Sequence, residues 1–179
     1  MTPSIDRRNL LRAGTVTAIP VAAAGLAGRA AAGPDPAGGG VRPRDVARWT
    51  AAYLDAWRAK DADAAALLFT EDALYEAVPG VPAQTFRGRD EIRRYWTDIT
   101  APQTDMTGRH GVPLCSGDRA AVELWVTMRI PADGGGARWV TLIETNVLYF
   151  DRRMRCRRNV EYWNMQDGRL DPPPGWGER

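Results

Sequence analysis

The sequence predicts an α+β domain in which three helices and one early strand precede a long antiparallel sheet. In the first half, apolar residues recur at three- and four-residue steps, which is typical of helices packed on one face. In the second half the period changes to two, which is typical of half-buried strands. The 179 residues have ordinary apolar and charged fractions and allow a single globular domain.

Helices are expected at 44–60, at 61–69 and from Gly88 onward, where Asp90 can cap the free backbone N–H groups. A short strand at 73–77 separates the second and third helices. The first helix carries a buried face that consists of Val46, Trp49, Tyr53, Leu54 and Trp57. The third carries Ile92, Tyr95, Trp96 and Ile99.

Long strands are expected at 119–130, 139–150 and 155–165, with a turn at Gly134–Gly136 between the first two. Alternation is clearest in the first of these strands, where one side consists of Val122, Leu124, Val126, Met128 and Ile130. The residues from 167 to 179 contain three consecutive prolines and are expected to form an irregular tail.

Residues 1–32 have the pattern of an export signal. Residues 6–12 resemble the bacterial twin-arginine motif, 13–28 are apolar but too short to span a membrane, and Ala30–Ala32 suits cleavage. The sequence therefore predicts a periplasmic, cell-envelope or secreted protein with no stable membrane span after cleavage. A disordered or membrane-tethered tail is the alternative. A Pro/Gly-rich linker follows at 33–43.

The whole chain has a net charge of +2, and its positive sign comes from this leader. Four arginines and one aspartate give residues 1–32 a charge of +3, so the remaining 147 residues carry −1. A nucleic-acid-binding protein needs a basic surface on its folded part, so no nucleic-acid partner is expected. The arginine-rich segment 152–158 is interpreted as a charged hairpin bend.

No cofactor and no metal are expected. Cys115 and Cys156 fit no zinc spacing, the single histidine gives no metal-ligand pattern, and the glycine runs lie in linker and hairpin contexts. In an exported protein the two cysteines can form one disulfide or remain two free thiols, and the sequence leaves both open.

Three segments carry a resemblance to a known family. Residues 53–61 (YLDAWRAKD), 68–73 (LFTEDA) and 88–96 (GRDEIRRYW) resemble the NTF2-like superfamily, which includes ketosteroid isomerases, SnoaL-like polyketide cyclases, limonene epoxide hydrolase and scytalone dehydratase. The resemblance covers about 44–166. It implies a curved sheet wrapped on helices to form a cone with an apolar pocket, commonly in a dimer. The fold hosts many unrelated reactions.

Comparison with ketosteroid isomerase suggests roles for single residues. By this resemblance Tyr53 matches the tyrosine that donates to the substrate oxyanion, Asn146 takes the place of the protonated aspartate, and Trp96 that of a pocket tyrosine. The apolar pocket strand corresponds to Val122, Leu124, Val126 and Met128. The general-base aspartate corresponds to Ala77, which cannot move a proton, so the ketosteroid isomerase mechanism is disfavoured.

Strand parity suggests a different acid–base pair. If Asn146 faces the interior, Leu142, Glu144 and Leu148 face it as well. A turn at Arg152–Arg153 would set Glu144 opposite Glu161, Asn146 opposite Asn159 and Leu142 opposite Trp163. Two carboxyls that close in an apolar cone cannot easily both be ionised, so one should hold a proton. An acid beside a carboxylate base suits dehydration, isomerisation, cyclisation or epoxide opening.

Two alternatives remain open at this point. The two glutamates can instead face outward toward Arg157 or Arg158, or the register can slip by one residue. His110 is either an acid/base group near the pocket mouth or an exposed loop residue. Besides His110, the residues expected to contact the ligand are Trp57, Trp96, Leu124, Val126, Met128, Leu148, Asn159 and Trp163.

The sequence thus predicts an exported, cofactor-free enzyme that acts on a small hydrophobic molecule of polyketide, terpene or steroid type. Its predicted catalytic residues are Glu144, Glu161, Tyr53 and Asn146. The alternatives are a ligand-binding protein without chemistry and a dimerisation module with a collapsed pocket. A homodimer is expected because the outer sheet face carries Trp125, Trp139, Ile143, Val147 and Tyr149.

Overall fold

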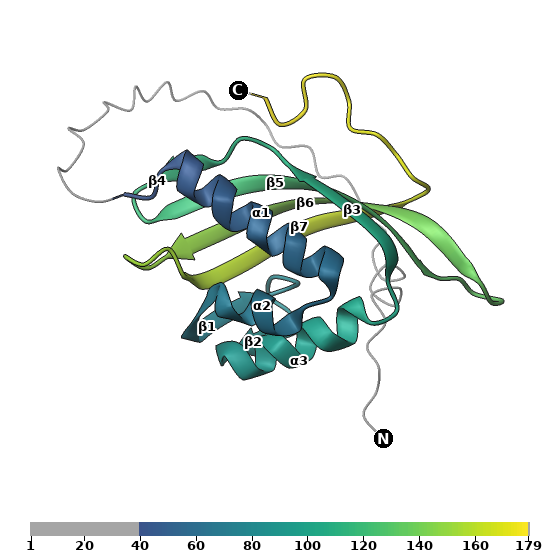
Figure 1. Ribbon diagram of the computed structural model, residues 1–179, viewed down its shortest axis with the longest axis horizontal. Helices are drawn as coiled ribbons and strands as arrows, with labels where there is room; N and C mark the ends of the chain where they lie inside the picture. The colour runs from purple at the N-terminus through teal and green to yellow at the C-terminus, as the bar shows by residue number, and fades with distance from the viewer. Residues whose placement is uncertain (1–39, 179) are drawn as a thin grey trace, which may run out of the picture. The chain divides into compact units, whose positions relative to one another are not determined.

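The computed structural model describes residues 40–178. The predicted signal peptide and most of the predicted linker lie outside these residues. Three helices pack on one face of a curved sheet (Figure 1). They are α1 (Pro43–Ala59), α2 (Ala62–Leu67) and α3 (Gly88–Thr100), and a short 3₁₀ turn, η2, spans Pro82–Gln84.

The sheet has seven strands in the order β2-β1-β7-β6-β5-β3, with β4 also paired to β5. The strands are β1 (Phe69–Glu76), β2 (Thr85–Arg87), β3 (Thr104–His110), β4 (Leu114–Ser116), β5 (Arg119–Pro131), β6 (Ala137–Phe150) and β7 (Cys156–Asp167). The predicted α+β class is confirmed.

The antiparallel arrangement predicted for the sheet holds for the other strand pairs, but β1 pairs with β7 in parallel. The two strands are separated by α3 and five strands, and parallel neighbours require such a long connection. This pairing joins the early strand directly to the last one.

Local chemistry explains the ends of the helices. Pro43 starts α1, and Lys60 ends it in the left-handed region with φ of 56°. The Asp61 carboxylate accepts from the Ala64 N–H at 2.8 Å and caps α2. The predicted cap of α3 by Asp90 is wrong, since the Glu91 carboxylate accepts from the Arg87 N–H at 2.7 Å instead.

The core lies between the helices and the concave face of the sheet. The alternation predicted for β5 is confirmed, because Val122, Leu124, Val126 and Met128 are at most 2% exposed. They face the helices. Gly108 of β3 shows how closely the layers approach, since a Cβ there would lie 2.8 Å from the Leu54 side chain of α1.

The chain after β7 runs back over the outer face of the sheet (Figure 1). The Trp125 indole of β5 donates to the Leu170 carbonyl at 2.9 Å and meets the Trp176 ring edge-on at 5.7 Å. The Thr141 hydroxyl of β6 donates to the Gly168 carbonyl at 2.8 Å. The tail therefore covers part of the apolar outer face that the sequence analysis assigned to a partner copy.

Both cysteines are free thiols in this structure. Cys156 is buried at the start of β7, where its thiol donates to the Arg158 carbonyl at 3.0 Å. Burial raises the pKa of the Cys156 thiol to about 12, so it is protonated at neutral pH. Cys115 lies on β4 and is half-buried.

Within residues 40–178, no helix is both long and apolar enough to cross a bilayer.

Candidate active site

The β6–β7 pairing differs from the predicted one by two residues. Glu144 lies opposite Trp163, Asn146 opposite Glu161, and Leu148 opposite Asn159. The register supposed in the sequence analysis, which set the two glutamates directly opposite each other, is wrong.

The turn between β6 and β7 explains the shift. The Asp151 carboxylate accepts from the backbone N–H groups of Arg153 and Arg155 at 2.8 and 2.9 Å, and Met154 takes the left-handed conformation with φ of 59°. This turn is longer than the two-residue turn expected, and the register also shifts between Tyr149 and Phe150. A shift of two leaves every side chain on its original face.

The four polar residues expected inside the cone are buried. Exposed fractions are 3% for Glu144, 2% for Glu161, 1% for Asn146 and 0% for Asn159. Glu144 and Glu161 are diagonal neighbours across β6 and β7, and such pairs have Cα atoms about 7–8 Å apart.

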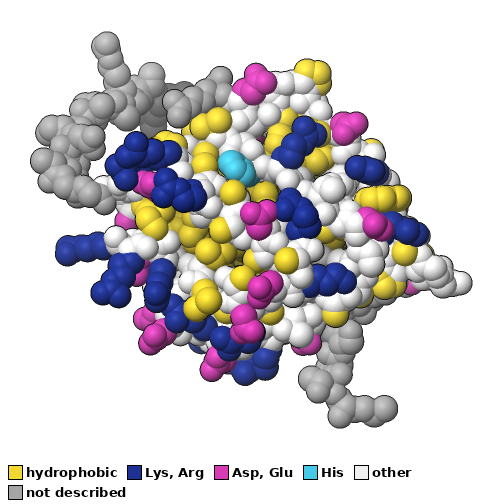
Figure 2. Space-filling view, viewed as in Figure 1, with side chains coloured by type: hydrophobic (Ala, Val, Ile, Leu, Met, Phe, Trp, Pro, Cys, Tyr) yellow, Lys and Arg dark blue, Asp and Glu magenta, His cyan; other side chains and the backbone are white. Residues whose placement is uncertain are grey.

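The alternative in which the glutamates pair with the arginines of β7 does not hold. Arg158 pairs with Glu76 at 2.7 Å, and Arg157 pairs with Asp118. At the left of Figure 2, Lys and Arg side chains gather where β6 turns into β7. The segment 152–158 therefore contributes exposed charge, as expected for a hairpin bend.

One carboxylate oxygen collects three hydrogen bonds. The Tyr53 hydroxyl donates to Glu161 Oε1 at 2.8 Å, the Tyr75 hydroxyl donates to the same atom, and Asn159 Nδ2 donates to it at 3.3 Å. The two tyrosine oxygens lie 2.9 Å apart. Donors from α1, β1 and β7 thus converge on one acceptor, and bonds to a charged acceptor are the stronger kind.

The two tyrosines are held in their protonated form. Burial, followed by the negative charge of Glu161, raises the pKa of both the Tyr53 and Tyr75 hydroxyls well above the usual 10. Glu144 adds to the rise in both cases. Both phenols therefore remain hydrogen-bond donors across the neutral pH range.

Tyr75 was missed by the sequence analysis. The sequence did contain a signal for Tyr75. The period of two along β1 places Tyr75 on the same side as Ala77, which corresponds to the general-base aspartate of ketosteroid isomerase. Ala73, Tyr75 and Ala77 are all buried. The pairing of Tyr75 with Asn159 depends on the parallel β1–β7 contact, which the sequence pattern did not indicate.

Aromatic rings surround this cluster. The Trp96 ring of α3 stands edge-on to Tyr53 with centroids 4.8 Å apart, and Trp57 lies 6.0 Å from Trp96. The Trp57 indole donates to Gln103 Oε1 at 2.6 Å, and the Trp163 indole donates to the Ala77 carbonyl at 2.8 Å. Trp57 and Trp96 are buried, whereas Trp163 is half-buried.

The aliphatic residues predicted to line the interior, Leu124, Val126, Met128 and Leu148, are all buried on the concave face. Burial on the concave face decreases toward the turn between β5 and β6, where Ile130, Trp163 and Met165 are only partly covered. The concave face is therefore most accessible at that end.

His110 lies apart from the carboxyl cluster. It ends the edge strand β3, is half-buried, and its Nδ1 lies 2.8 Å from the Gly111 carbonyl oxygen. It pairs with Leu124, which in turn pairs with Glu144, so two strand spacings separate His110 from Glu144. That distance is about 10 Å between backbones.

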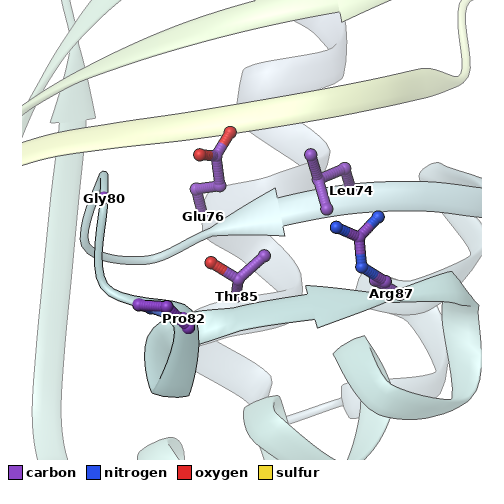
Figure 3. A pocket seen from close by; sticks show the side chains of 6 residues that line it. All are labelled: Leu74, Glu76, Gly80, Pro82, Thr85 and Arg87. Carbon is purple, nitrogen blue, oxygen red and sulfur yellow. The ribbon is translucent and has the colours of Figure 1, made fainter.

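A surface groove of about 340 Å³ lies outside the cone. Figure 3 shows its lining, which consists of Leu74, Glu76, Gly80, Pro82, Thr85 and Arg87. Leu74 and Glu76 alternate with Tyr75 along β1 and so point to the opposite face. The groove is thus separate from the Tyr53–Tyr75–Glu161 cluster. Among residues 40–178, no three His, Cys, Asp or Glu side chains converge in a way that could hold a metal ion.

Comparison with protein families identifies the family of this chain. The family profile described as a SnoaL-like domain matches residues 50–169, about two thirds of the chain. The chain belongs to the SnoaL-like domain family. No curated protein matches this SnoaL-like chain.

One solved structure similar to this SnoaL-like chain is SalBIII, an epoxide hydrolase/cyclase-like enzyme described for its role in pyran ring formation in the polyether salinomycin. The two share 20% identity with a TM-score of 0.55, and the match covers 68% of this chain and 94% of SalBIII. At that identity the likeness establishes the fold alone. The NTF2-like α+β cone predicted from the sequence is confirmed.

Proposed function

We propose that this SnoaL-like protein is an enzyme that performs acid–base chemistry without a cofactor on a small hydrophobic substrate. The reaction would be a cyclisation, isomerisation, dehydration or epoxide opening. The observation that carries the proposal is the buried Glu161 carboxylate, which is held by Tyr53, Tyr75 and Asn159 with buried Glu144 on the neighbouring strand. SalBIII, named for epoxide hydrolase and cyclase chemistry, supports the ring-forming and epoxide-opening options.

The hydrogen bonds suggest which carboxyl is the base. Three donors on Glu161 Oε1 stabilise the ionised form of Glu161. Glu144 and Glu161 are both buried on neighbouring strands, and two carboxyls this close in an apolar interior cannot easily both be ionised. Glu144 is accordingly the group that keeps a proton and acts as the acid.

The proposed reaction moves two protons. Glu161 takes a proton from a substrate carbon, hydroxyl or water, and Glu144 gives its proton to the oxygen that becomes a hydroxyl or leaves as water. Exchange with solvent then returns both groups to their starting states. Tyr53 acts here by orienting Glu161, which differs from the oxyanion-donor role implied by ketosteroid isomerase. Asn146, opposite Glu161, orients the substrate.

Turnover by carboxyl variants tests the proposal. Wild type, Glu144→Gln and Glu161→Gln are compared on a panel of cyclic epoxides and hydroxyketones, with products identified by mass spectrometry. Each variant is expected to lose at least about 100-fold in kcat/KM, because each lacks one proton-transfer group. Glu123→Gln, an exposed carboxyl on the outer side of β5, is the control and should match wild type. The proposed enzymatic function would be refuted if wild type turned over none of the compounds, or if both variants turned them over as fast as wild type.

Ligand binding without chemistry is the alternative function. The same panel separates the two, because a carrier or sensor would bind a compound, detected by calorimetry, and return it unchanged.

Export by a twin-arginine-type route is part of the proposal and rests on residues 6–12. Changing Arg7 and Arg8 together to Lys is expected to retain the protein in the cytoplasm with residues 1–32 attached. Cell fractionation and intact mass measure this outcome. Normal export of that variant would contradict it.

A homodimer through the outer sheet face is also proposed. The tail covers Trp125, but Ile143, Val147 and Tyr149 are half-buried on that face and Tyr162 is 55% exposed. Light scattering after size exclusion is expected to give twice the chain mass for wild type and the single mass for Val147→Glu. A monomeric wild type would contradict the dimer.

A further inference from the structure

Three buried polar atoms near Glu161 have no hydrogen-bond partner among the described residues. They are Trp96 Nε1, Asn146 Oδ1 and Asn159 Oδ1. Their residues are at most 3% exposed. Buried polar groups are almost always satisfied, because an unmade hydrogen bond is costly. Three such atoms in one region therefore require an explanation.

The three atoms belong to the same cluster of side chains. Asn159 donates to Glu161, Asn146 lies directly opposite Glu161 on β6, and Trp96 packs edge-on against Tyr53, which donates to Glu161. Asn146 and Asn159 are therefore direct neighbours of the carboxylate proposed as the base, and Trp96 is connected to it through Tyr53.

The orientation of the Asn159 amide is determined by its neighbour. Asn159 Nδ2 donates to Glu161 Oε1 at 3.3 Å, and a rotated amide would set Oδ1 against the carboxylate oxygen instead. Asn159 Oδ1 is therefore held as an acceptor, and only a donor can satisfy it. The Trp96 indole is donor-only and requires an acceptor.

We infer that the cone binds an apolar ring compound that carries a hydroxyl group and a second oxygen. The hydroxyl donates to Asn159 Oδ1 or Asn146 Oδ1, and the second oxygen accepts from Trp96 Nε1. A ketone or epoxide without a hydroxyl leaves both asparagine oxygens unsatisfied, so it binds more weakly. A site built to bind a hydroxyl rejects the analogue that lacks it.

This inference rests on the proposed function only in using the same site, and it narrows the substrate to hydroxylated compounds. It also explains why polar groups occupy positions where leucine would fit. The unsatisfied atoms destabilise the ligand-free protein and become favourable when the ligand binds.

Three probes with one skeleton test the inference. Borneol, camphor and bornane share a rigid bicyclic frame and carry at one position a hydroxyl, a carbonyl or a methylene. Dissociation constants are measured by calorimetry and by tryptophan fluorescence on the full chain. Wild type is expected to bind borneol about tenfold tighter than camphor, because the borneol hydroxyl can both donate to an asparagine oxygen and accept from Trp96 Nε1, whereas the camphor carbonyl can only accept. Camphor should bind tighter than bornane, which can do neither.

Variants assign each preference to its residue. Asn146→Leu with Asn159→Leu is expected to remove the preference for borneol over camphor, and Asn146→Leu alone to reduce it about threefold. Trp96→Phe is expected to remove only the preference for camphor over bornane. Equal or tighter binding of camphor by wild type, an unchanged borneol preference in the double variant, or binding of none of the three probes would overturn the inference.

Melting temperature supplies an independent readout without ligand. Asn146→Leu is nearly isosteric and is expected to raise the melting temperature by about 3 °C, because it removes an unsatisfied buried group. Thr141→Val on the outer side of the same strand is the matched control. Its hydroxyl donates to the Gly168 carbonyl and accepts from the Leu170 N–H, so this variant should melt lower. A lower melting temperature for Asn146→Leu would count against the inference.

Binding and turnover are scored separately. A borneol preference without wild-type turnover of any panel compound leaves the inference standing and refutes the proposed enzyme. Turnover that is lost in Glu144→Gln, but with no preference for the hydroxylated probe, refutes the inference and leaves the enzyme standing.

Discussion

The two faces of β6 and β7 use polar side chains in opposite ways. On the outer face, the buried Thr141 hydroxyl has two partners in the tail, and Arg157 and Arg158 form exposed ion pairs. On the concave face, Glu161 Oε1 accepts from three donors, whereas Asn146 Oδ1 has no partner among the described residues. Both faces come from the same two strands, and only the parity of the residue differs.

The difference separates stabilising polar groups from functional ones. A satisfied hydroxyl such as that of Thr141 fastens the tail to the sheet and adds to stability. Buried carboxyls and an unsatisfied amide reduce stability, so a sequence that retains them on the concave face indicates that this face binds or transforms something. Four experiments test this contrast between the two faces.

Trp125→Ala is expected to have the largest effect on stability. The change removes a ring that is 9% exposed, its hydrogen bond to Leu170 and its contact with Trp176. The free energy of unfolding should fall by about 3–5 kcal/mol, as for other buried tryptophans, measured by urea denaturation. Deleting residues 169–179 should remove much of the same stability, so the two changes combined should be less than additive. Full additivity would show that the tail does not support Trp125.

Tyr75→Phe tests the concave face with a single atom removed. Loss of a donor to buried Glu161 is expected to lower the free energy of unfolding by about 1.5–3 kcal/mol. Tyr149→Phe is the matched control on the outer face. The Tyr149 ring lies within 5.8 Å of the guanidinium groups of Arg119, Arg157 and Arg158, and a phenyl ring retains that contact. The control should change stability by less than about 0.5 kcal/mol, and equal losses would remove the contrast.

Alkaline pH probes the same tyrosines without mutation. Their pKa values are raised in the folded state, so their contribution to stability is complete below about pH 10 and is lost as the pH rises toward the folded pKa. The free energy of unfolding should fall above pH 10 by up to about 1.4 kcal/mol per pH unit for each tyrosine. Urea titrations between pH 8 and 11.5 should show a shallower fall in Tyr53→Phe and Tyr75→Phe. Exposed Tyr162→Phe should follow wild type, and identical slopes in all proteins would contradict the burial effect.

Asp118→Asn is expected to have the smallest effect. It breaks the ion pair with Arg157, in which both side chains are about half exposed. Such pairs contribute less than about 1 kcal/mol, and added salt should reduce the difference from wild type further. A loss as large as that of Tyr75→Phe would mean that charges on the outer face contribute as much as those inside.

From the sequence, one could predict which side chains share a face. The period of two along β6 and β7 follows from local geometry, so it grouped Glu144 with Asn146, and Asn159 with Glu161, before any register was known. The burial of all four confirms that the shared face is the concave one. The prediction of the faces remained correct although the predicted β6–β7 turn was too short, because a register shift of two residues preserves parity.

Which of these residues meet depends on long-range packing. The turn after Asp151 set the two glutamates diagonally, the parallel contact of β1 with β7 brought Tyr75 to Glu161, and the tail covered Trp125. Each of these contacts joins segments that no repeating pattern relates, because a periodic signal reports the direction of a side chain and not its partner across space. The periodic sequence therefore determined the faces of the sheet, and long-range packing determined the candidate site built on one of them.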